Sequence, residues 1–156
     1  MRNKLTHKDF FDDIIFLNNI IKNSNLKIYM WSDMLLNHIK FPHSISNGDE
    51  DFELNIFNIP KSIILCDWQY WKENDFPSTK FLKENGFIVY GATWCKKNNI
   101  IDFADFVKNE IDFEHSGIIS TTWSGALLNK SDVLFSKGCE LSSPSEIINF
   151  SGKVFW

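Results

Sequence analysis

Apolar residues follow two different spacings along this chain. Between residues 7 and 23 they recur every three to four positions, as in a helix with one buried face: Phe10, Phe11, Ile14, Ile15, Leu17, Ile20 and Ile21. Thr6 followed by Asp9 three residues later is the pattern of a capping box, and a polar run at 23–25 ends the segment. We therefore predict an amphipathic helix over about residues 7–23.

Further along, four short runs are mainly apolar and do not alternate strictly with polar residues. They cover residues 26–31, 63–68, 87–92 and 117–122. Strands that are solvent-exposed on one face alternate between apolar and polar residues, whereas strands covered on both faces do not. These runs therefore predict a parallel sheet whose strands are joined by right-handed crossovers.

The segments between the predicted strands supply helices. Residues 77–86 predict one that starts at Pro77 or Ser78 and ends at Gly86, and further helices are expected over 100–111 and 142–150. Residues 32–59 are the least regular part, with a short helix possible over SDMLLNHI and an exposed loop over SISNGDEDFE. The predicted fold class is α/β, with about four parallel strands and crossover helices in a single domain over residues 1–156.

Charge and composition limit the partners that we expect. The 156 residues are 44% hydrophobic and 23% charged, with a formal net charge of −4 and no strong cluster of lysine and arginine. Nucleic-acid binding is therefore not expected, because it depends on basic contacts to phosphate. No apolar run approaches the roughly 20 residues of a membrane-spanning helix, and the N-terminus does not read as a secretory signal.

The cysteines indicate a reducing environment. Their number is odd, they are widely spaced at Cys66, Cys95 and Cys139, and they form no Cys-x-x-Cys pair. We expect free thiols, with Cys95 a small semi-buried one, and a cytoplasmic location.

Aromatic and acidic residues gather where the predicted strands end. Four tryptophans and three polar residues lie at or just after these ends: Trp31, Trp68, Trp94 and Trp123, with Asp33, Asp67 and Tyr70. The carboxyl ends of parallel strands share one side of a sheet, and ligands bind there. An indole face can stack on a pyranose ring, and carboxylates accept hydrogen bonds from sugar hydroxyls, so these residues predict a carbohydrate site. Alternatively, the tryptophans close the top of the core, and Asp33 and Asp67 cap the helices that follow them.

The histidines give no such pattern. His7, His38, His43 and His115 are scattered and form neither an HxH nor an HExxH motif. We therefore predict no metal site and no cofactor.

Four stretches together resemble a known family. IYMWSDML, IPKSIILCDWQYW, FPSTKFLKENGFIVYGATW and GIISTTWSG are similar to the C-terminal half of family 20-like glycoside hydrolases of the β-N-acetylhexosaminidase type. Those enzymes are TIM barrels, and the resemblance spans strands five to eight, about residues 26–125. It implies a hexosamine-type pocket with the four tryptophans as walls and with Asp33, Asp67 and Tyr70 as polar contacts.

The resemblance does not extend to the catalytic residues. The family uses an Asp-Glu pair after strand four, which would lie before residue 1 of this chain. The acidic run Asp49-Glu50-Asp51 lies in a segment without a predicted strand. We therefore expect a carbohydrate-binding domain that lacks the usual pair. The alternatives are an active or split glycosidase that uses Asp33 and Asp67 as acid and base, and a non-catalytic assembly subunit or fragment.

Half a barrel would leave two open sheet edges and an uncovered inner face, built from residues such as Ile28, Ile64, Val89 and Ile119. We therefore expect a homodimer, or a partner chain that supplies the other half. Alternatively, the helix at 7–23 or the segment Val154-Phe155-Trp156 folds over the exposed face and keeps the chain monomeric.

Overall fold

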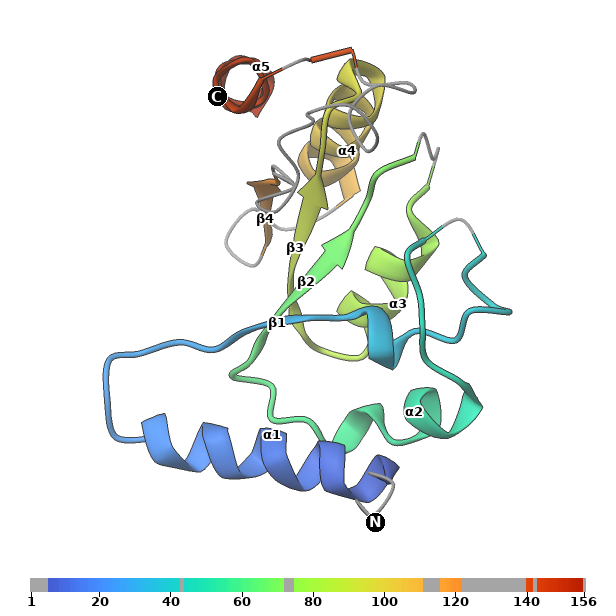
Figure 1. Cartoon of the computed structure of the whole chain (residues 1–156), viewed down its shortest axis with the longest axis vertical. Helices are drawn as coiled ribbons and strands as arrows, with labels where there is room; N and C mark the ends of the chain where they lie inside the picture. Colours follow the sequence, from blue (N-terminus) through green and yellow to red (C-terminus); the bar gives the residue numbers. More distant parts are fainter. Residues whose placement is uncertain are drawn as a thin grey trace, which may run out of the picture. The chain divides into compact units, whose positions relative to one another are not determined.

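Four parallel strands form the centre of the fold. The structure, a computed structural model, describes residues 6–42, 44–71, 75–110, 116–121, 140–141 and 143–155. Its strands follow one another in a single sheet of order β1-β2-β3-β4 (Figure 1): β1 (Tyr29–Trp31), β2 (Ile64–Trp68), β3 (Ile88–Thr93) and β4 (Ser116–Ser120). This confirms the predicted α/β class with four parallel strands.

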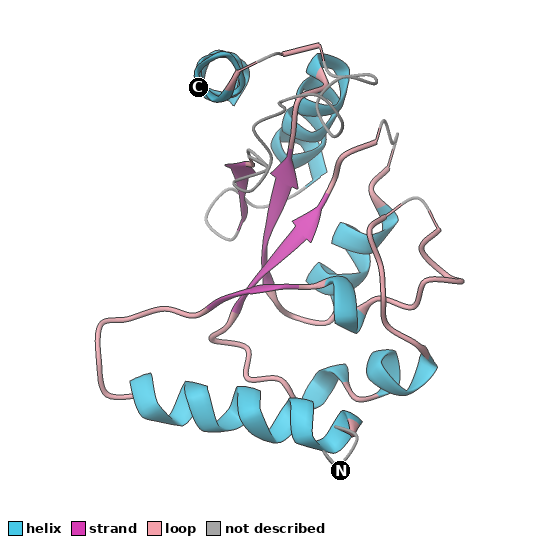
Figure 2. Cartoon of the chain, in the orientation of Figure 1, coloured by secondary structure: helices cyan, strands magenta, loops and turns pink. Residues whose placement is uncertain are grey.

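Helices alternate with the strands (Figure 2). They are α1 (His7–Ile21), α2 (Glu50–Leu54), α3 (Pro77–Glu84), α4 (Lys97–Glu110) and α5 (Pro144–Phe155), with single 3₁₀ turns η1 (Asp33–Leu35) and η2 (Ile56–Asn58). None of the helices among the described residues is both long enough and apolar enough to span a membrane.

Local signals in the sequence set two helix ends as predicted. The Thr6 hydroxyl accepts a hydrogen bond from the Asp9 N–H, and the Asp9 carboxylate accepts one from the Thr6 N–H, which completes the capping box of α1. Gly86 follows α3 with a φ of 81°, a conformation that glycine adopts without steric cost.

The segment predicted as an exposed loop contains a helix instead. Asp49 caps α2 by accepting a hydrogen bond from the Phe52 N–H at 3.0 Å, and the Phe52 side chain is buried. Just before it, the Gly48 N–H donates to the Asp33 and Leu36 carbonyls. A Cβ at Gly48 would lie 2.3 Å from the Met34 carbonyl oxygen, so only glycine fits this approach.

The contacts divide the chain into two compact units. Unit 1 comprises Met1–Asp67 and Pro77–Val89, and unit 2 comprises Trp68–Phe76 and Tyr90–Trp156. The chain therefore passes from one unit to the other three times, and two of these passages lie inside β2 and β3.

The core of unit 1 lies on one face of β1 and β2. Met30 and Leu65 are neighbours in the parallel register and both belong to this core, as do residues of α1, α2 and α3. Ile28 and Val89 belong to it too. Tyr29 pairs with Ile64, and successive residues of a strand point to opposite faces, so Ile64 points away from this core. The prediction that Ile28, Ile64 and Val89 share one face is therefore wrong.

Unit 2 has two apolar clusters among its described residues. One contains Phe76, Phe103, Phe106 and Val107, and the other contains Cys95, Ile100, Leu141 and Ile147. Cys95 is disulfide-bonded, so the prediction of a free thiol at this position is wrong.

Candidate functional site

The end of β1 carries an exposed indole, Trp31, followed by two hydrogen-bonded polar residues, Ser32 and Asp33. Trp31 is 38% exposed, while the next residue, Ser32, is buried. The Asp33 carboxylate accepts a hydrogen bond from the Asn47 side-chain amide at 2.8 Å. Asp33 is the first residue of η1, and Ser32 is its N-cap. The Asp33 side chain therefore does not cap this turn; it binds the loop residue Asn47.

Asp67, near the end of β2, is fully buried in a ring of hydroxyl donors. Its Oδ2 accepts hydrogen bonds from Ser78 and Thr79, each at 2.8 Å, and Ser32 lies 3.3 Å from its Oδ1. Ser78 and Thr79 belong to the first turn of α3, and Ser32 follows β1. The carboxylate thus joins two strand ends to the first turn of the helix that follows.

Three of the predicted aromatic residues come together in unit 2. Tyr70 is buried, with its ring centroid 5.4 Å from that of Trp94 and 6.3 Å from that of Trp68. The Trp68 and Tyr70 rings are nearly parallel, with an interplanar angle of 24°. Trp68 ends β2, Trp94 follows β3, and both are half-buried.

A buried polar chain supports this aromatic cluster of Trp68, Tyr70 and Trp94. The Tyr70 hydroxyl lies 3.0 Å from the Thr121 hydroxyl oxygen, which in turn donates to the Thr93 carbonyl at 2.8 Å. The Thr121 N–H donates to the same carbonyl at 2.9 Å. Tyr70 is therefore tied to the ends of β3 and β4, and the two indoles lie against an oriented ring.

The predicted site residues thus fall into two groups. Trp31, Asp33 and Asp67 lie in unit 1, and the aromatic cluster lies in unit 2. Trp123 lies outside the described residues.

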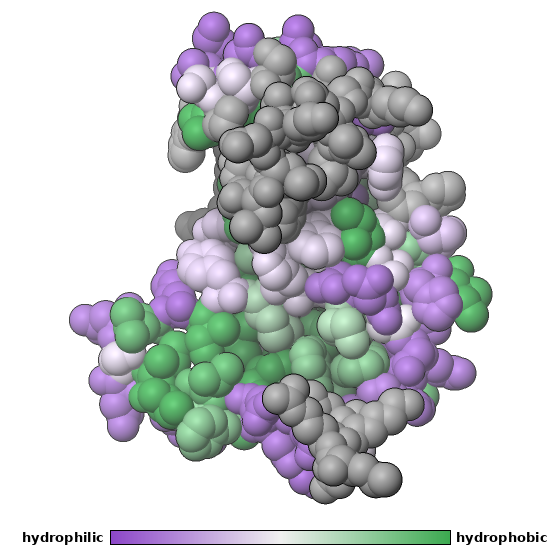
Figure 3. Space-filling model, viewed as in Figure 1, coloured by the Kyte–Doolittle hydropathy of each residue, from purple (hydrophilic) through white to green (hydrophobic). Residues whose placement is uncertain are grey.

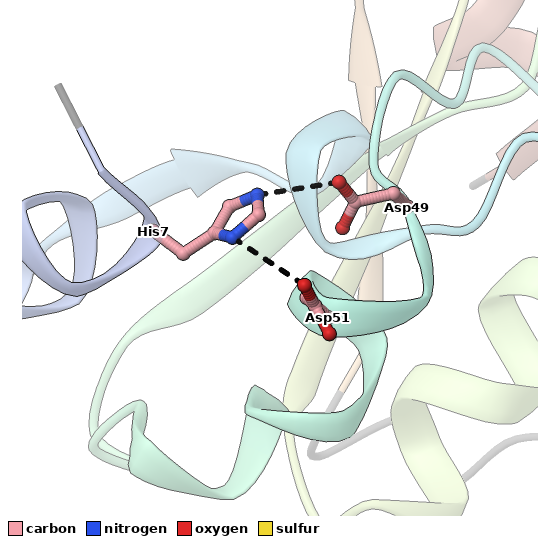
Figure 4. Close-up of side chains that lie close together, drawn as sticks. All are labelled: His7, Asp49 and Asp51. Carbon is pink, nitrogen blue, oxygen red and sulfur yellow. Dashed lines mark ion pairs between the residues drawn. The ribbon is translucent and has the colours of Figure 1, made fainter. Parts of the chain in front are cut away.

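A second constellation was missed by the sequence analysis. In unit 1, the His7 Nε2 lies 3.2 Å from the Asp49 Oδ2, and its Nδ1 lies 3.8 Å from the Asp51 Oδ2 (Figure 4). His7 opens α1, whereas Asp49 and Asp51 lie at the start of α2. No spacing motif joins residues so distant in the sequence. The sequence signals at these positions are local: Thr6 caps α1 just before His7, and Asp49 caps α2. Neither cap indicates that the two helix starts lie together.

A groove of about 520 Å³ lies beside this constellation. Its walls come from one flank of α1 and from the α2–η2 segment: His7, Lys8, Phe11, Asp12, Ile15, Asp51, Asn55 and Asn58. Phe11 is buried, Lys8 pairs with Asp12, and the two asparagines contribute amides. The groove therefore combines apolar surface with hydrogen-bonding groups and is large enough for a small molecule.

The comparisons with known proteins add no identification. No protein-family model matches the chain, and no curated protein matches it either.

Proposed function

We propose that this chain is a carbohydrate-binding domain of glycoside-hydrolase type, with a hexosamine-type sugar as its ligand. The observation that supports this best is the aromatic cluster in unit 2, where Trp68 and Trp94 are half-buried and flank the buried Tyr70. Both indoles lie at strand ends, the side of a parallel sheet where ligands bind. A partly exposed indole offers the flat apolar surface on which a sugar ring stacks.

The proposal is for binding without hydrolysis. A carboxyl group that protonates a leaving group must reach the substrate. Asp67 is fully buried and accepts hydrogen bonds from Ser78 and Thr79, so its carboxylate is occupied by the fold itself. Asp33 is likewise engaged by Asn47.

A sugar titration tests the proposal. N-acetylglucosamine and its short oligomers are added to the full chain while tryptophan fluorescence is followed, with isothermal calorimetry as a second readout. We expect saturable binding that Trp68→Ala and Trp94→Ala each weaken about tenfold or more, the effect of losing about 1.4 kcal/mol of contact.

Phe57→Ala is the matched control, because Phe57 is a 68% exposed aromatic residue of η2 in unit 1. This variant should bind sugar like the unaltered chain. Absence of any response at millimolar sugar in the folded protein would refute the proposal, as would equal losses in the control and in the two tryptophan variants.

A further inference from the structure

A nitrogen donor and two carboxylates converge on the surface of unit 1. His7 comes from the first turn of α1, and Asp49 and Asp51 come from the start of α2 (Figure 4). One ligating atom from each of the three residues lies within 4.8 Å of the others. We propose that His7, Asp49 and Asp51 bind a divalent transition-metal ion of the zinc type.

The separation between His7 and Asp49 fits a coordination shell. Two ligands of one tetrahedral zinc ion lie about 3.3 Å apart, because zinc–nitrogen and zinc–oxygen bonds are about 2.0–2.1 Å long. The His7 Nε2 and the Asp49 Oδ2 are 3.2 Å apart. Asp51 lies 3.8 Å from the other ring nitrogen, Nδ1, so its carboxylate has to turn to reach an ion held at Nε2; its side chain is 72% exposed, which leaves room for that movement.

Phe52 positions two of the three donors. Its N–H donates to the Asp49 Oδ1 at 3.0 Å, which leaves Oδ2 directed at His7. Its ring contacts the His7 imidazole edge-on, with centroids 4.3 Å apart. The hydrogen bond from Phe52 lowers the pKa of the Asp49 carboxyl, so this ligand is ionised at neutral pH. Metal ligands usually have such supporting contacts.

The donor set indicates which ions would bind. Imidazole nitrogen suits zinc and its transition-metal neighbours, whereas magnesium and calcium prefer oxygen ligands alone. Two carboxylates balance the charge of a divalent cation when His7 is neutral.

The site is accessible from the groove in unit 1. His7 and Asp51 line that groove together with Phe11 and Asn55. Three protein ligands leave at least one position of a zinc ion open to water or to another molecule. A bound ion would therefore border a space in which a small molecule could share its coordination.

Metal binding to the full chain tests the proposal. Zinc is titrated by calorimetry at neutral pH, and magnesium is titrated in parallel. We expect one zinc ion per chain with a micromolar dissociation constant, and much weaker binding of magnesium. His7→Gln and Asp51→Asn should each weaken zinc binding about tenfold or more.

Asp13→Asn provides the control, because Asp13 is an exposed acid of α1 outside the cluster. It should leave the affinity unchanged, and circular dichroism checks that each variant is folded. Zinc binding no tighter than millimolar would overturn the proposal. So would a zinc affinity that His7→Gln leaves unaltered.

Discussion

Asp67 shows how a single side chain can join several elements. Ser78 and Thr79 in the first turn of α3 donate to its Oδ2, and Ser32 at the end of β1 lies within hydrogen-bonding distance of its Oδ1. Hydrogen bonds to a charged group contribute about 1.5–3 kcal/mol each, and a buried donor left without its acceptor is costly. The residue is therefore more important for the fold than a surface aspartate.

Asp67→Asn should lower the free energy of unfolding by about 2 kcal/mol, because the amide keeps one acceptor oxygen and loses the charge. Urea denaturation measures this change. Asp33→Asn is the comparison, since Asp33 is only half-buried and bonds to one side chain, Asn47. Equal losses in the two variants would contradict the role assigned to Asp67. A glycosidase activity that Asp67→Asn abolishes in folded protein would instead favour the hydrolase alternative.

Cys66 gives a prediction about pH. Burial, with a smaller effect of the neighbouring Asp67 carboxylate, raises the pKa of its thiol from 9.0 to about 11. In the unfolded chain this thiol loses its proton near pH 9, while in the folded chain it keeps it. The unfolded state therefore binds fewer protons between these values, and stability should fall as the pH rises from 9 to 11.

The measurement is urea denaturation at several pH values, compared with Cys66→Ala. Lysines also titrate in this range, so the difference between the two proteins is the relevant quantity. The destabilisation caused by Cys66→Ala should shrink with rising pH. A difference that stays constant from pH 8 to 11 would show that Cys66 titrates normally.

Contacts between residues at the ends of neighbouring strands could be predicted from the sequence. Trp68 and Trp94 lie at the ends of consecutive strands, so their meeting around Tyr70 could be predicted from the parallel order alone. His7 and Asp49 meet because two separate helix starts come together, and no periodicity encodes that contact. The burial of Asp67 could not be predicted either, because nothing in the sequence around it indicated the three hydroxyl groups that lie beside its carboxylate.

At the scale of elements, β3 and α4 pack closely at a glycine. A Cβ placed on Gly91 would lie 1.9 Å from the ring of Phe103, which is almost fully buried. Gly91→Ala should therefore force the ring or the strand to move and lower stability by about 1–3 kcal/mol. Thermal unfolding monitored by circular dichroism measures the effect.

Gly152→Ala is the matched substitution in α5. A Cβ at this position meets no atom within 4 Å, so alanine should raise stability by about 0.5–1 kcal/mol through its better helix propensity. The two variants should thus change the melting temperature in opposite directions. A stabilising Gly91→Ala would mean that Phe103 does not pack on β3 in solution.

Long elements were predicted better than short ones. Residues 7–23 contain a strong helical period and a capping box, and α1 spans His7–Ile21. The five residues of α2 are too few to show a period, so their helix depends on the Asp49 cap and on burial of Phe52. All four strands were found, and their ends differ from the predicted ones by at most three residues, because pairing with a neighbour decides where a strand begins.

At the scale of the whole molecule, exposed apolar surface favours association. Phe16 and Ile20 of α1 are each 63% exposed, and Tyr29 of the edge strand β1 is 51% exposed. Hydrophobic residues gather over α1 on the face shown in Figure 3. Apolar patches of this kind mark interaction sites in soluble proteins.

We therefore expect a homodimer, with a mass near twice the 18.2 kDa of one chain. Light scattering at micromolar concentration measures the mass. Ile20→Lys should favour the monomer if α1 forms the interface, and Tyr29→Lys should do so if the edge strand forms it. A mass of one chain for the unaltered protein would exclude the dimer.

The three passages of the chain between the two units limit how the protein can be divided. Unit 1 consists of two separate stretches of sequence, and so does unit 2. Cutting the backbone once, at any position, cannot release either unit intact. A truncated gene that ends after β2 would encode unit 1 without α3 and the start of β3. Isolating unit 1 would require a short artificial connection from Asp67 to Pro77 and a stop after Val89.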